Sequence, residues 1–186
     1  MPFDPRSGLL AFTAFALAVA PVRAGTTLSV TARSGEDLVR AAAEIWAGDA
    51  RLIYVENDED VLTDGSSLRW GYLFYSPSED DARAYSVRGD EILVAEDLAF
   101  AFDAPPLPSA WIDSAHALAA AEAAKGAQFR EEHDGRLRSM FLVRGLFHPD
   151  DPDSATWAVV YDSPAASGLW VIVDAESGKV VKKWRG

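Results

Sequence analysis

The sequence predicts an α+β protein in which a helix followed by antiparallel strands occurs twice. The segment 70–77 (WGYLFYSP) recurs later in the chain as the segment 157–164 (WAVVYDSP). Each copy follows an Ala-rich helical segment and precedes another alternating strand and a turn. Self-similarity of this kind indicates a small module used in tandem.

The first unit, residues 25–100, is predicted to begin with a helix. Residues 34–37 (SGED) resemble a capping box, in which a Ser side chain caps the first turn and a carboxylate follows three residues later. One apolar face is expected to end at Gly48. Its members recur at helical spacing: Leu38, Ala41, Ala42, Ile45 and Trp46.

Alternating strands are predicted after this helix. Leu52 and Tyr54 belong to a first strand, and Asp64-Gly65 marks a turn. A second strand carries Trp70, Tyr72 and Phe74 on one side, and we expect the helix to cover this aromatic side, although a ligand groove is the alternative. The final hairpin of the unit comprises residues 84–87 and 92–94.

Residues 101–110 (AFDAPPLPSA) are predicted to form a semi-rigid linker because they are rich in proline. The second unit, residues 111–186, then opens with an N-cap at Asp113 and a helix that ends near Gly126. Residues 127–133 fit either a further helical turn or a short strand. Four strands are predicted in this unit: 137–147, 155–161, 169–173 and 179–184.

The second unit carries a recognisable series of strands. An Ala-rich helix precedes the strands 157–161 (WAVVY) and 169–173 (LWVIV), and the turn 174–180 (DAESGKV) follows. Through these segments residues 111–184 resemble a PepSY domain, and the first unit resembles a diverged copy without the D-A-x-S-G turn. The resemblance implies tandem cystatin-like units, each a helix packed on a curved antiparallel sheet of three to four strands. It also implies a binding or regulatory role toward peptidases or bacterial envelope proteins, and it assigns no catalytic residue.

The amino-terminal segment predicts export. Residues 9–20 (LLAFTAFALAVA) are apolar but too few to span a bilayer, and residues 22–24 (VRA) resemble a cleavage site. We therefore expect residues 1–24 to be a signal peptide, with a buried N-terminal helix as the alternative. A chain without Cys fits the bacterial periplasm or the culture medium, with no membrane insertion after cleavage.

Composition excludes several functions. The net charge of −12 repels phosphate groups, so nucleic acid is not an expected partner. The absence of Cys excludes thiol catalysis and Cys-ligated zinc. No nucleotide-binding fingerprint occurs, and no cofactor is predicted.

One acidic loop contains residue types that bind cations. His148, Asp150, Asp151 and Asp153 could supply hard ligands to Ca²⁺. The loop lacks a D-x-D-x-D-G pattern, however, and two prolines restrict how it can wrap an ion. We predict a solvated hairpin tip without a metal, and we retain a cation as the alternative.

The remaining polar clusters do not predict an enzyme. Asp113, Ser114 and His116 lie too close together at a helix start to form a triad, and no G-x-S-x-G motif occurs. Residues 131–134 (EEHD) contain no H-E-x-x-H motif and are expected to be an exposed turn.

The second face of each predicted sheet is the candidate binding surface. Leu73, Tyr75 and Val160 point away from the helix-covered side, and Trp170 adds a large side chain to those that two small cores must accommodate. Such residues serve either in packing between the two units or in binding a partner.

These observations predict a secreted or periplasmic, non-catalytic binding or regulatory protein, with a peptidase or an envelope protein as its partner. The alternative is a periplasmic protein that binds a small ligand or a cation in a cleft between the two units. The oligomeric state is open at this point.

Overall fold

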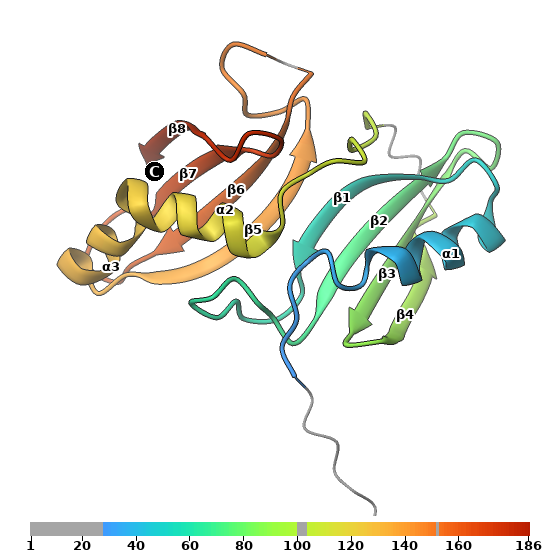
Figure 1. The fold of residues 1–186 in the computed structure, drawn as a ribbon, viewed down its shortest axis with the longest axis horizontal. Coiled ribbons are helices and arrows are strands. Elements are labelled where there is room, and N and C mark those ends of the chain that lie inside the picture. The colour runs from blue at the N-terminus through green and yellow to red at the C-terminus, as the bar shows by residue number, and fades with distance from the viewer. Residues whose placement is uncertain (1–27, 100–103, 152) are drawn as a thin grey trace, which may run out of the picture.

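The computed structural model of the chain describes residues 28–99, 104–151 and 153–186. The predicted signal peptide lies outside these residues, as does part of the predicted linker. Within them, eight strands form one antiparallel sheet, and the helices cover one of its faces (Figure 1). The protein is therefore α+β, as the sequence predicts.

The strands of the two predicted units join in the middle of this sheet. The order is β4-β3-β2-β1-β5-β6-β7-β8, and β1 (Arg51–Asn57) pairs with β5 (Arg136–Arg144). The sequence predicts a separate sheet for each unit, but one continuous sheet is present. The other strands are β2 (Trp70–Ser76), β3 (Asp81–Arg88), β4 (Glu91–Asp97), β6 (Ala155–Asp162), β7 (Leu169–Asp174) and β8 (Val180–Arg185).

Helix α1 (Glu36–Trp46) forms where the sequence predicts it, but its buried face is different. Val39 and Ala43, one turn apart, pack on the sheet, whereas Ile45 is 88% exposed. The predicted capping box is also wrong, because Gly35 occupies the N-cap and no side chain caps this end. The hydrophobic pattern therefore predicts the position of the helix correctly, but the face that it predicts to be buried is displaced by about one residue around the helix axis.

The helical run of the second half continues through residues 127–133, which is the helical one of the two predicted alternatives. It comprises α2 (Ser114–Ala121), a π-helical segment η1 (Glu122–Gly126) and α3 (Ala127–His133), and the Asp113 side chain caps its start as predicted. Gly126 does not end the helix. It lies against the Tyr161 ring, where a Cβ atom would overlap the phenol. The run ends at Asp134, which is left-handed with φ +50°.

Two tryptophans hold corresponding positions in the two halves of the core. The Nε1 atom of Trp70 donates to the Val30 carbonyl at 2.8 Å, and that of Trp157 donates to the Ile112 carbonyl at 2.8 Å. Each carbonyl precedes a helix. The two rings are fully buried and meet edge to face, with centroids 6.1 Å apart. The residues beneath α1 and beneath α2 thus form one continuous hydrophobic core.

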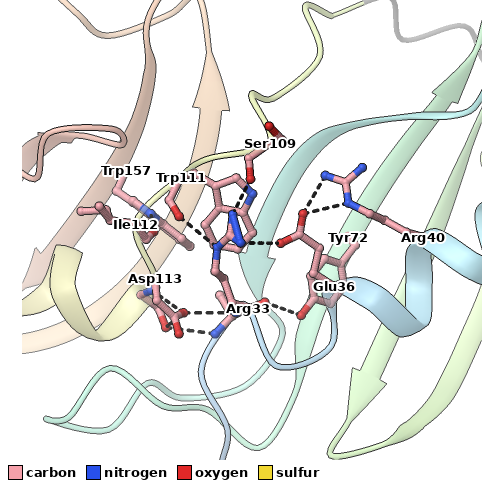
Figure 2. Close-up of polar contacts among 11 residues, drawn as sticks. Arg33, Glu36, Arg40, Tyr72, Ser109, Trp111, Ile112, Asp113 and Trp157 are labelled. Atoms are coloured by element: carbon pink, nitrogen blue, oxygen red, sulfur yellow. Dashed lines mark hydrogen bonds and ion pairs between the residues drawn. The ribbon is translucent and has the colours of Figure 1, made fainter.

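Arg33 joins the starts of the two helices (Figure 2). Its guanidinium donates to the Trp111 carbonyl at 2.9 Å and to the Ser109 carbonyl at 2.7 Å, and it lies 4.2 Å above the Trp111 ring. Its backbone N–H donates to Asp113 Oδ1 at 3.1 Å. One residue from the first half therefore holds the segment that leads into α2.

Ser114 makes a second connection between the halves. Its Oγ donates to the Gly65 carbonyl at 2.7 Å and accepts from the Ala32 N–H at 3.0 Å. The loop that contains Gly65 lies so close to α2 that a Cβ on Gly65 would come within 2.6 Å of the Ala115 Cα atom.

Candidate binding surface

The face of the sheet opposite the helices is hollow in the first half. Because side chains alternate along a strand, Trp70, Tyr72 and Phe74 are buried beneath α1, as predicted, and Gly71 and Leu73 point to the helix-free face. Gly71 pairs with Ser86, and Leu73 pairs with Ala84. Small residues on β2 and β3 therefore leave space beside Leu73.

This space is an apolar groove with a volume of about 460 Å³. Tyr54 forms one wall from β1, and Val94 forms the other from β4, the edge strand. Leu98, which follows β4, also lines it. We call this space the β1–β4 groove.

Polar side chains close one end of the β1–β4 groove, and they bind one another. The Tyr54 hydroxyl donates to Glu56 Oε2 at 2.9 Å, and the Ser86 hydroxyl donates to Asp58. The Asp58 carboxylate also lies 3.6 Å from the Nε atom of Arg69. Burial, followed by the nearby Glu56 charge, raises the pKa of Tyr54, so this phenol stays protonated as a hydrogen-bond donor.

Gly71 makes this arrangement possible. A Cβ atom at this position would come within 2.6 Å of Asp58 Oδ1, so the glycine leaves the space in which this carboxylate lies. Gly71 therefore helps to shape the acidic end of the groove.

The same face is filled in the second half. Phe147, from the β5–β6 hairpin, contacts Phe141, Trp170 and Trp184, with ring centroids 5.9 to 6.2 Å apart. Trp170 stacks on Trp184 with centroids 5.4 Å apart. Ile172, on the same face, is fully buried. The chain thus covers this half with its own aromatic side chains and leaves the β1–β4 groove open.

A second apolar hollow flanks β4 on the helix-covered face. It has a volume of about 320 Å³ and lies between the end of α1 and the outer strands. Ile45 and Trp46 line it from α1, and Ile92 and Ala95 line it from β4. Edge strand β4 therefore has an apolar hollow on each side.

A third hollow, of about 450 Å³, lies where residues 60–63 meet the second half. The predicted alternative function places a small ligand at such a junction. Charged side chains line it, and two of them, Glu122 and Arg130, form an ion pair at 2.5 Å. The Tyr161 hydroxyl donates to the same Glu122 side chain at 2.8 Å.

The four predicted binding residues form two groups, one in each half of the sheet. Leu73 lines the β1–β4 groove, and Tyr75 is buried in a small cluster with Ile53 and Ala82. Val160 and Trp170 pair across β6 and β7 in the filled half. Of the four, Leu73 alone lines an open hollow among those described above.

The acidic loop uses its polar groups to hold its own backbone. His148 Nδ1 accepts from the Asp151 N–H at 2.9 Å, and Asp151 accepts from the Asp153 N–H at 3.0 Å and from the Ser154 hydroxyl at 2.8 Å. The Ser154 hydrogen bond lowers the pKa of Asp151. Asp150 is exposed, and Pro152 lies outside the described residues. In the described part of the chain, no three His, Cys, Asp or Glu side chains group as metal ligands would.

The other polar residues considered from the sequence have structural contacts or face solvent. Ser114 binds the backbone of the first half, as described above, and His116 is exposed on α2. Residues 131–133 belong to α3 and are not part of a turn as predicted.

Apart from Leu73, the residues that shape the β1–β4 groove were not predicted from the sequence. The sequence signal for the groove was a set of small residues on the same face of two neighbouring strands: Gly71 on β2, and Ala84 and Ser86 on β3. The contacts of Arg33 with Ser109 and Trp111 gave no local signal, because those two residues lie more than seventy positions away.

No helix among the described residues is both long and apolar enough to cross a membrane. Comparisons of the chain with models of protein families, with curated proteins and with solved structures found no match.

Proposed function

We propose that this chain is a non-catalytic binding or regulatory protein of the bacterial periplasm or culture medium, and that it binds an extended segment of another protein. The β1–β4 groove carries this proposal. It is apolar, open and bounded by an edge strand, which can pair with an added strand while side chains of that strand enter the hollows beside it.

Charge favours a basic partner. β4 carries Glu91, Glu96 and Asp97, and Glu56 and Asp58 lie at the polar end of the groove. The whole chain has a net charge of −12. A segment that alternates apolar and basic residues would complement both the groove and its edge.

We further propose that the two halves are tandem PepSY-like, cystatin-like units, and that the partner is a peptidase or another envelope protein. The repeated order of a helix and four strands supports this, as do the matching contacts of Trp70 and Trp157. The charged hollow beside residues 60–63 is the site for the small-ligand alternative. We favour the groove, because Glu122 and Arg130 in that hollow already pair with each other.

The test is capture from periplasmic and secreted fractions with immobilised protein, identified by mass spectrometry. We expect the wild type to retain a partner and Val94→Arg to lose it, because the new charge would occupy the groove wall. Leu62→Arg is the matched control, since Leu62 is 50% exposed and does not line the groove. Calorimetry with the identified partner should then give a saturable 1:1 isotherm. Equal capture by wild type and Val94→Arg would contradict the proposal.

A further inference from the structure

The two edges of the sheet carry opposite charges. Among the described residues, β4 pairs only with β3, and β8 pairs only with β7. β4 carries three carboxylates, Glu91, Glu96 and Asp97, of which Asp97 pairs with Arg83 on β3 at 3.1 Å. β8 presents three cations: Lys182, Lys183 and Arg185.

The edges also have the directions that pairing between copies requires. Each pair of neighbouring strands is antiparallel, so β4 and β8 run in opposite directions. A second copy in the same orientation would therefore bring its β4 antiparallel to β8 of the first, with the helix-free faces on the same side.

Matching side chains lie on this shared face. On β4, Val94 pairs with Ser86 and Glu96 with Ala84, which places both on the helix-free face. On β8, Lys182 pairs with Ile172 and Trp184 with Trp170, which places both on that face as well. Val94 and Glu96 are two residues apart on β4, and Lys182 and Trp184 are two residues apart on β8. An antiparallel pairing that places Lys182 opposite Glu96 therefore also places Trp184 opposite Val94, at the wall of the β1–β4 groove.

We propose that copies of this chain associate head to tail, with β8 of one copy pairing with β4 of the next in this register. The inference rests on the proposed function, because it names a second copy as the partner of the groove edge. Two β4 edges would repel each other, as would two β8 edges, so only unlike edges join. A contact between two different surfaces leaves both ends open, and the assembly is a chain rather than a closed dimer.

Sedimentation velocity of the purified protein tests this directly. We expect the weight-average sedimentation coefficient to rise with concentration up to about 1 mM, and to rise less in high salt. Glu96→Lys and Lys182→Glu should each weaken association about tenfold, because each places like charges opposite each other.

Charge exchange separates pairing from a general charge effect. The double variant E96K/K182E should regain association, and so should an equimolar mixture of the two single variants, because each then supplies the charge that the other requires. Glu131→Lys and Lys179→Glu are the matched controls, since both residues are exposed and lie outside the two edge strands.

Three outcomes would overturn the inference: a monomer at every concentration, single variants that associate like their controls, or no recovery in the double variant and the mixture. The capture assay with Val94→Arg measures binding of a different protein, so it tests the β1–β4 groove independently of self-association. If the protein is monomeric at every concentration and Val94→Arg still abolishes capture of the partner, self-association is rejected and the proposed function is retained.

Discussion

Single residues decide how closely the two halves approach each other. Gly65 has φ +83°, a conformation that L side chains adopt at a cost of about 1 to 2 kcal/mol. Its carbonyl accepts the Ser114 hydroxyl hydrogen bond, and its Cα hydrogen faces the Ala115 backbone. The position therefore requires glycine both for conformation and for space.

We expect Gly65→Ala to lower the free energy of unfolding by more than about 3 kcal/mol, because a Cβ would overlap the start of α2 in addition to straining the backbone. Gly89→Ala is the control: φ is +61°, but no atom lies within 4 Å of the added Cβ, so a loss of only about 1 to 2 kcal/mol is expected. Urea unfolding measures both. Equal losses would show that the contact with Ala115 contributes nothing.

At the scale of one element, Tyr161 contacts both ends of the π-helical segment in the second helical run. Its hydroxyl reaches Glu122, and its ring lies against Gly126, the residues at the two ends of that segment. Burial, together with the Glu122 hydrogen bond and charge, raises the pKa of Tyr161, so the phenol remains the donor.

Gly126→Ala should be destabilising by about 2 to 4 kcal/mol, because its Cβ would meet the Tyr161 phenol. Tyr161→Phe alone should cost about 1 to 3 kcal/mol through the lost hydrogen bond to a carboxylate. In the double variant the clash is partly relieved, so the combined loss should be smaller than the sum of the two. A double-mutant cycle from urea unfolding checks this, and simple additivity would argue against the contact.

Elements were predicted from the sequence more reliably than their associations. Alternation placed the strands that became β1 to β8, and Asp113 marked the start of α2, since both signals are local. The rotation of α1 was misjudged, because Leu38, Val39, Ile45 and Trp46 offer two overlapping apolar stripes. Pairing of β1 with β5 uses backbone hydrogen bonds, which leave no mark on side-chain choice. The β1–β4 groove arises where small residues on β2 and β3 pair with each other, and their pairing could not be read from the sequence.

At the scale of the whole molecule, the sheet, the core and the Arg33 contacts all cross the boundary between the two predicted units. A protein assembled in this way should unfold as one cooperative body. We expect a single calorimetric transition, with coincident urea curves from tryptophan fluorescence and far-ultraviolet circular dichroism.

Arg33→Ala should lower stability by about 2 to 4 kcal/mol without splitting this transition, because the guanidinium donates to two carbonyls and stacks on Trp111. Arg51→Ala, at an exposed position on β1, is the matched control and should cost less than about 0.5 kcal/mol. Two separate transitions in the wild type would contradict cooperative unfolding.

The central pairing of β1 with β5 also has a consequence for each half on its own. Deleting either half would expose an unpaired strand beside Trp70 or Trp157, and would remove the contacts that position the remaining helix. Either half produced alone is therefore expected to aggregate through that edge.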